Sequence, residues 1–217
     1  MSLPQTNLKT EATGRPRLKQ VERTALSDAR MFEAAMHLIV EHGTHNTTLK
    51  EIGERAGYSR GLASNRFGSK ETLFSQMVRD FNETWASELR RFVGNATGLT
   101  ALQCALDSLE FFLTNRTVQM QAMYTLWFES ISSYPVVRRR LAANHIAYRR
   151  DTARWVKKAI EDGEVHPWVD PDSFSVEFNA LIFGLVYQWL VNPSAINIHT
   201  VLKHYRENTM QRIKIKG

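Results

Sequence analysis

The sequence predicts an all-α protein, and three features of the chain lead to this prediction. Apolar residues recur at three- and four-residue spacing through most of the 217 residues. Residues that favour helix starts, such as Thr48 and Ser69, precede some of these segments, and glycines such as Gly43 and Gly57 follow others. Alternation with period two, which would indicate β-strands, is not sustained anywhere. We therefore expect helices joined by short connections.

The first predicted helix runs from Ser27, which can cap its start, to Gly43, and its apolar residues share one face. The second begins at Thr48, which forms a capping box with Glu51. It is expected to stop at Gly57, because glycine readily takes the left-handed conformation that ends helices. These two helices are therefore bounded by local signals alone.

The third predicted helix covers residues 60–67 and is capped by Ser59. The fourth starts at Ser69 and carries an apolar side as far as Phe92, before Gly94 breaks it. A three-helix unit ending near Phe67 is thus followed by a longer helix.

The pattern of apolar residues in the second half of the chain predicts five more helices. They are expected over residues 99–115, 118–132, 135–162, 172–191 and 194–213, the third of them starting at a proline, which suits the first turn of a helix.

These elements divide the chain into three expected parts. Residues 1–22 form a flexible basic arm, residues 23–75 form a helix-turn-helix DNA-binding domain, and residues 76–217 form a larger helical domain for ligand binding and dimerisation.

Composition restricts the class of protein. A hydrophobic content of 43% and a charged content of 23% are typical of globular proteins. The single cysteine, Cys104, excludes an internal disulfide and fits a reducing cytoplasm. The chain starts with polar residues, and its most apolar stretch, residues 178–191, is too short to span a bilayer. We therefore expect a cytoplasmic protein with no membrane partner.

The net charge of +6 favours an anionic partner, and half of the excess lies in residues 1–26. Within this arm, the segment Gly14-Arg15-Pro16-Arg17 is similar to the Gly-Arg-Pro core that lies along A·T-rich minor grooves. Arg15 and Arg17 are therefore candidate DNA contacts. A solubilising tail is the alternative interpretation of the same residues.

The most specific signal is the pair of short capped helices between Thr48 and Phe67, which has the spacing of a helix-turn-helix. Ala63 and Phe67 share the face expected to pack inward. The opposite face carries the candidates for base contact, Arg60, Gly61, Ser64 and Asn65. Candidates for phosphate contact lie at helix ends and flanks: Thr48, Ser59, Arg66 and Lys70. A helical hairpin with a solvated polar face is the alternative.

This region also resembles a known family, the TetR family of transcriptional regulators, over roughly residues 27–75. The matching residues are Ala34, Ala35, Leu38, Ile39, Glu41, His42, Gly43, Thr47, Thr48, Glu51, Ile52, Ala56, Gly57, Ser59, Arg60, Gly61, Phe67, Gly68, Ser69, Lys70, Glu71 and Leu73. The resemblance implies a homodimer on a near-palindromic operator, usually acting as a repressor that a small molecule releases. It also implies that the polar face of the third helix meets double-stranded DNA and that Lys70 binds phosphate.

The sequence departs from the family pattern at three positions. Ser64 stands where the family commonly has tyrosine, and Arg66 where it commonly has histidine. The phosphate contact expected of that tyrosine could pass to Arg66. Ala63 replaces a common leucine, and Leu62 could compensate by repacking.

The second half of the chain is rich in aromatic residues, which serve as core fillers or line a ligand pocket. The family resemblance favours a pocket for a small-molecule effector on the helix that carries Met120, Met123, Tyr124, Trp127 and Phe128. Three carboxylates could face inward and select a cationic or hydrogen-bonding ligand, with solvent exposure as the simpler interpretation: Asp107, Glu110 and Glu129.

The last two predicted helices match the family's dimer interface. The first of them is apolar around much of its circumference, which indicates burial on more than one side, although a central position in the bundle would explain it too. If this helix forms the interface, a charge at Leu181 or Leu185 should weaken the dimer.

Other functions have weaker support. The basic run 138–140, with further cations up to Lys158, could be a second anion-binding surface or a solvated helix face. His37 and His42 are five residues apart, which does not suit a helical metal pair, and no phosphate-binding glycine loop occurs, so we expect neither an enzyme nor a cofactor. A helical small-molecule-binding or interaction protein without sequence-specific DNA binding would leave the basic arm unexplained.

Overall fold

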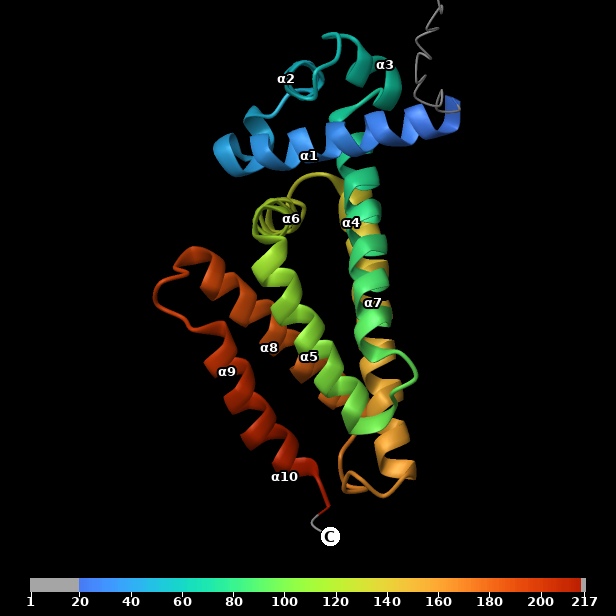
Figure 1. Ribbon diagram of the computed structural model, residues 1–217, viewed down its shortest axis with the longest axis vertical. Helices are drawn as coiled ribbons and strands as arrows, with labels where there is room; N and C mark the ends of the chain where they lie inside the picture. Colours follow the sequence, from blue (N-terminus) through green and yellow to red (C-terminus); the bar gives the residue numbers. More distant parts are fainter. Residues whose placement is uncertain (1–19, 216–217) are drawn as a thin grey trace, which may run out of the picture.

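The computed structural model describes residues 20–215, and the predicted all-α architecture is confirmed (Figure 1). Among the described residues, β-structure is limited to one isolated bridge, between Val165 and Lys214. One long helix and two short ones lie across one end of the molecule, and further long helices run away from them (Figure 1).

The first end consists of α1 (Gln20–Asn46), α2 (Leu49–Arg55) and α3 (Leu62–Phe67). The ring of Phe67 lies 5.8 Å from that of Phe32, which anchors α3 on α1. The predicted start of α1 was wrong: Ser27 lies inside the helix, and its hydroxyl donates to the carbonyl of Thr24. The preceding residues are mostly good helix formers, so the helix extends back to Gln20, into the last residues of the predicted arm.

Gly43 interrupts α1 as predicted, with a φ of 77°, although the helix resumes for a few residues and reaches Asn46. The next helices are α4 (Lys70–Val93), α5 (Gly98–Asn115) and α6 (Thr117–Glu129). The predicted cap of α4 is confirmed, because the Ser69 hydroxyl accepts a hydrogen bond from the backbone N–H of Thr72.

The long helix α7 (Pro135–Glu161) starts with proline in its first turn, as predicted, and packs beside α4 and α5. It is followed by α8 (Pro171–Val191), which packs along α7 (Figure 1). Large apolar side chains from α4 and α5, including Phe74 and Phe112, fill the space between the helices and are fully buried.

The last predicted helix, residues 194–213, was wrong in two respects. Residues 192–195 form a turn, and the helix starts only after Asn197, whose side chain accepts from the N–H of Thr200. The segment is then divided into α9 (Ile198–Tyr205), a π-helical turn (Arg206–Met210) and α10 (Gln211–Ile213).

The length of α8 also corrects the expectation that the most apolar stretch of the chain is too short to span a bilayer. The helix begins at Pro171 and has 21 residues, so among the described residues it is long and apolar enough to cross a bilayer by length and composition. Core helices of other proteins pass the same test, so this is weak evidence. Only 28% of its most apolar window is buried, which leaves apolar side chains on the surface.

Candidate functional site

The start of α2 has the predicted capping box. The Thr48 hydroxyl accepts from the N–H of Glu51 at 3.2 Å, and the Glu51 carboxylate accepts from the N–H of Thr48 at 3.0 Å. The hydrogen bonds from Thr48 also lower the pKa of Glu51. Gly57, with a φ of 80°, follows the helix, as predicted. The first half of the helix-turn-helix is therefore fixed by its own residues.

The close approach of α2 to α3 depends on Gly53, which the sequence analysis did not single out. A Cβ at this position would lie 3.0 Å from the carbonyl oxygen of Ser59 and 3.8 Å from the Cβ of Ala63. Ala63 is fully buried at this contact, so small residues on both helices set their spacing. The common leucine of the family would have to displace this contact. Leu62, which we expected to compensate, is half-buried.

The polar face of α3 is oriented as the helical wheel predicted. Ala63 and Phe67 point inward, at 0% and 5% exposure. Ser64 and Asn65 lie on the exposed side of α3, as predicted. Arg60 and Gly61 were expected on the same helix but lie in the turn before it, where both are exposed. Because rigid apolar contacts hold the back of the helix, its front presents a donor-rich surface of fixed shape.

The predicted cap of α3 was wrong. Ser59 is exposed and precedes a turn, in which its carbonyl accepts from the N–H of Leu62 at 3.0 Å. The helix starts at Leu62, and Gly61 at the N-cap position has no side chain to supply a cap. The turn uses the backbone of Ser59, so its hydroxyl is left for other contacts.

Two of the candidate DNA-contacting cations, Arg60 and Arg66, form ion pairs within the chain. Arg60 Nε lies 2.5 Å from a carboxylate oxygen of Glu54, and the Arg60 side chain is 75% exposed. Arg66 donates two hydrogen bonds to Asp28, at 3.0 and 3.1 Å. Arg60 therefore belongs to a surface ion pair of small net energy, which a guanine contact could replace.

Lys70 has a structural contact besides its proposed phosphate contact. Its ammonium donates to the carbonyls of Thr44 and His45, at 2.8 and 3.1 Å, near the end of α1. Arg15 and Arg17, the candidate minor-groove residues, lie outside the described residues.

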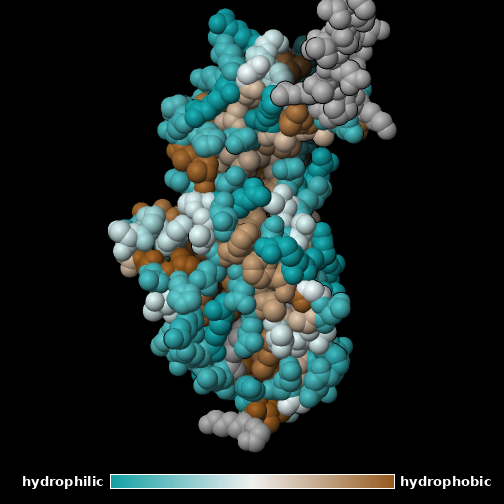
Figure 2. Space-filling view, in the orientation of Figure 1, coloured by the Kyte–Doolittle hydropathy of each residue, from teal (hydrophilic) through white to brown (hydrophobic). Residues whose placement is uncertain are grey.

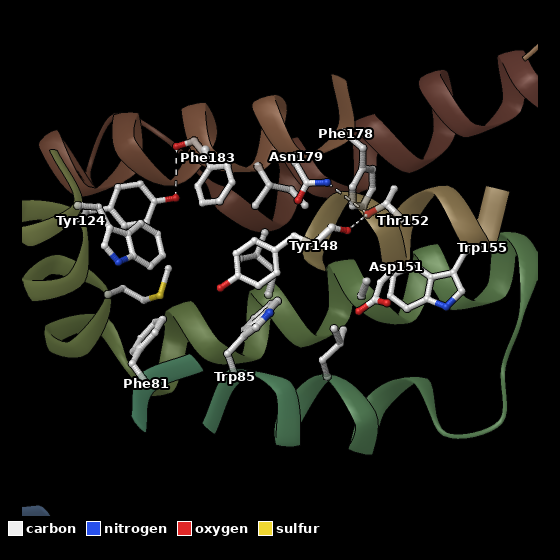
Figure 3. Close-up of a pocket in the computed structure, with 16 residues that line it drawn as sticks. Phe81, Trp85, Tyr124, Tyr148, Asp151, Thr152, Trp155, Phe178, Asn179 and Phe183 are labelled. Carbon is white, nitrogen blue, oxygen red and sulfur yellow. Dashed lines mark hydrogen bonds between the residues drawn. The ribbon is translucent and has the colours of Figure 1, made fainter. Parts of the chain in front are cut away.

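A cavity of about 90 Å³ lies between α4, α5, α6, α7 and α8 (Figure 3). Of the five candidate pocket residues, Met120, Tyr124 and Trp127 line it. Met123 is fully buried elsewhere in the core, and Phe128 is 51% exposed, with its ring 5.2 Å from that of Tyr187. The residues that face the cavity and those that do not therefore lie on different sides of α6.

The cavity wall is mainly aromatic, and the sequence analysis missed most of it. Tyr148, Asp151 and Trp155 share one face of α7 at helical spacing, while Asn179 and Phe183 belong to α8. The helical spacing of these residues is visible in the sequence, but the sequence does not show which other helix each face packs against. The other lining residues are Phe81, Trp85, Leu89, Ala105, Leu109, Thr152, Phe178 and Ile182.

The polar groups of the cavity are mostly paired with one another or with the backbone. The Asn179 amide donates to the Thr152 hydroxyl at 3.3 Å and to the Ser175 carbonyl at 2.8 Å (Figure 3). Burial raises the pKa of the Tyr124 and Tyr148 phenols well above the ordinary value, so both stay neutral. Apart from Asp151, a ligand therefore meets apolar walls and neutral polar groups.

Asp151 is the one carboxylate that lines this cavity, at the end occupied by Trp155 and opposite to Tyr124 (Figure 3). The three carboxylates considered from the sequence lie elsewhere. Asp107 pairs with Arg206, and Glu110 lies 2.7 Å from His199, so both connect α5 to the C-terminal segment. Glu129 accepts a hydrogen bond from the buried hydroxyl of Thr44.

The exposed side of α8 forms an apolar stripe. The turn after α8 protrudes from the molecule, and hydrophobic surface is visible beside it (Figure 2). Exposed positions recur along one face of the helix: Val176, Ala180, Tyr187 and Val191. Leu185, a position where we expected a charge to weaken a dimer, is 7% exposed and packs in its own subunit. Leu181 is half-buried and lies at the edge of the stripe.

Two segments of the chain match known protein families. Residues 32–77 match the bacterial regulatory proteins of the tetR family, and residues 122–205 match the tetracyclin repressor-like C-terminal domain. Together the matched segments cover more than half of the chain.

Individual relatives agree with this assignment. The regulator TtgR of Pseudomonas putida is 23% identical over 175 residues, which are 78% of this chain and 83% of TtgR. A transcriptional regulator from Saccharomonospora viridis, solved in complex with choline, has a similar fold, with a TM-score of 0.76, 18% identity and coverage of 88% of this chain and 100% of that one.

The repressor SmeT of Stenotrophomonas maltophilia, solved in complex with triclosan, gives a TM-score of 0.73 at 21% identity, with coverage of 88% and 93%. The helix-turn-helix geometry and the two matched segments lead to the same conclusion: the chain belongs to the TetR family of transcriptional regulators.

Proposed function

We propose that this chain is a cytoplasmic transcriptional repressor that binds a near-palindromic operator as a homodimer and leaves it when a small molecule binds. The observation that carries the DNA-binding part is the exposed polar face of α3, supported from behind by Ala63 and Phe67. A helix of this kind fits the major groove, where Arg60 would read guanine and Asn65 adenine. Ser59 and Arg66, on its flanks, would hold the phosphate backbone.

The cavity between α4 and α8 is the proposed effector site. Solved relatives hold choline or triclosan, so small molecules of different chemistry bind within this fold. In this chain the aromatic wall around Trp85, Trp127 and Phe183 favours a ligand with an apolar body. The shape of the cavity and the charges around this wall would determine which small molecule binds.

The exposed stripe on α8 is the proposed dimer interface. Ala180 and Gly184 are small, so a second copy of the helix could approach closely, and Val176 and Val191 would add apolar area. A dimer buries this stripe and also supplies two DNA-binding heads, as a two-fold symmetric operator requires.

The path from effector to DNA would run along α6, which packs across α1 (Figure 1). Tyr124 and Trp127 of this helix line the cavity, and Glu129 at its end accepts from Thr44 at the end of α1. The hydroxyl of Tyr134 lies 3.1 Å from that of Thr44 and belongs to the same contact. A ligand that shifts α6 would therefore move α1 and change the spacing of the two heads.

The contribution of Arg60 tests the DNA-binding part of the proposal. Arg60→Ala should weaken binding to a selected operator by about ten- to a hundredfold, because a bidentate guanine contact discriminates by about 1–3 kcal/mol. Binding to random duplex should weaken much less. The measurement is a titration of both duplexes over a series of salt concentrations, in which the affinity of the parent chain should fall steeply with salt.

Arg139→Ala is the matched control, since Arg139 is an exposed arginine of the basic run on α7. It should leave both affinities unchanged. Equal losses for the two variants would assign DNA contact to the basic run as well, and salt-independent binding of the parent chain would contradict the proposed function.

A further inference from the structure

A second hollow adjoins the effector cavity. It is a groove of about 590 Å³ between the end of α4, residues 94–97 and the last turns of α7. Leu89, Asp151 and Trp155 line both the cavity and the groove, so these side chains stand between the two spaces. Figure 3 places Asp151 and Trp155 at one end of the cavity, which is therefore the end that faces the groove.

The size of the cavity indicates that its ligand extends into the groove. An engineered cavity of roughly 150 Å³ holds benzene, and ligand pockets usually measure about 300–1,000 Å³. The aromatic cavity, at about 90 Å³, holds only part of such a molecule. The rest of the ligand has to lie outside the cavity, and the groove offers the larger space beside it.

The charge of the groove differs from that of the cavity. Its ionisable side chains are four cations and two carboxylates: Arg90, Arg154, Lys157, Lys158, Asp151 and Glu161. Arg154 lies 3.5 Å from Asp151, and Lys158 lies 2.5 Å from Asp162, so these two cations have partners. Within the described part of the chain, Arg90 and Lys157 form no ion pair.

Asp151 would attract a cationic ligand if it were unpaired, but two arginines lie close to it. Arg154 is 3.5 Å away and Arg150 is 3.6 Å away, and both contacts reduce the negative potential between the two spaces. Beyond Asp151 the excess of positive charge favours an anion.

We propose that the effector is an amphipathic anion, with an apolar tail in the aromatic cavity and an anionic end in the groove, beside Arg90 and Lys157. This inference rests on the proposed effector function of the cavity and names the chemical class of the ligand. The tail displaces water from apolar walls, and the anionic end keeps its contact with solvent and with the two cations.

Three probes with the same ten-carbon tail test the charge of the effector: decanoate, decanol and decyltrimethylammonium. The two ionic probes are used below their micelle concentrations and decanol below its solubility limit. Trp85, Trp127 and Trp155 line the cavity, so intrinsic tryptophan fluorescence reports binding, with the thermal midpoint of the full chain as a second readout. We expect decanoate to bind about tenfold more tightly than decanol and to lose this advantage at high salt.

The Arg90→Gln/Lys157→Gln double variant should lower decanoate affinity by about tenfold and leave decanol affinity unchanged. Arg139→Gln, which removes an exposed arginine of α7 outside the groove, should change neither. Asp151→Asn should strengthen decanoate binding, because it removes the nearest negative charge.

Equal binding of decanoate and decanol would overturn the anionic assignment and leave the effector cavity standing. Tighter binding of decyltrimethylammonium, abolished by Asp151→Asn, would overturn it in favour of a cation. If no probe binds and none changes the thermal midpoint, the proposed effector function of the cavity fails together with the inference.

Discussion

Replacing Ala180 with glutamate is expected to convert the proposed dimer into monomers and to lower operator affinity by about a hundredfold or more. Ala180 is exposed at the middle of the α8 stripe, next to Gly184, where no side chain fills the space. Two carboxylates brought together in an apolar interface would each lose hydration without gaining a partner. A monomer keeps one head, so it loses the effective concentration that links two half-sites.

The measurement is the molar mass of the chain in solution, by ultracentrifugation, alongside an operator titration. Ala143→Glu is the matched control, because Ala143 is exposed on α7 and lies outside the stripe. This control should remain dimeric and bind DNA normally. An Ala180→Glu variant that stays a tight dimer would place the interface on another surface.

Replacing Gly53 with valine is expected to destabilise the helix-turn-helix and abolish DNA binding. Gly61→Ala, in contrast, should weaken DNA binding without lowering the stability of the helix-turn-helix. Even a Cβ at Gly53 meets the Ser59 carbonyl at 3.0 Å, so the larger valine forces α2 and α3 apart, at a cost of about 1–3 kcal/mol or more. At Gly61 the nearest atom to a Cβ is the Asn65 amide nitrogen, at 3.9 Å, so alanine fits the free protein.

Thermal unfolding and DNA titration of both variants separate the two roles. The proposed contact of Gly61 with DNA depends on close backbone approach, which a methyl group on the exposed face would hinder. Normal DNA binding by Gly61→Ala would remove this residue from the interface. Normal stability of Gly53→Val would show that the helices tolerate a wider spacing.

Signals confined to a few residues were predicted well from the sequence. The capping box of Thr48 and Glu51 and the Ser69 cap were both found where the sequence placed them. Each depends on contacts within one helical turn, which neighbouring residues determine. The inward face of α3 was also predicted, because the helical period fixes which residues share a face.

Predictions failed where two local structures compete. Ser27 and Ser59 are both good capping residues, yet one lies inside a helix and the other in a turn. The helix formers before Ser27 and the backbone turn at Ser59 outweigh the capping preference. Sequence spacing also gave no warning that the last helix would be divided by a π-helical turn.

The cavity could be predicted only in part. Met120, Tyr124 and Trp127 were identified because α6 was known from the resemblance, whereas Asp151 and Asn179 come from helices distant in the sequence. Which faces of α7 and α8 meet α6 is decided by packing of the whole bundle. The exposure of Phe128 and the burial of Leu185 follow from the same packing.

The central claim, that a symmetric pair of α3 helices reads DNA, is tested most directly by selecting bound duplexes from a random pool with the full chain. We expect the enriched sequences to contain an inverted repeat, with half-site centres about one helical turn or a multiple of it apart. Enrichment of a single unpaired half-site would contradict the symmetric dimer. A pool that shows no enrichment, although the chain is folded and dimeric, would contradict sequence-specific DNA binding itself.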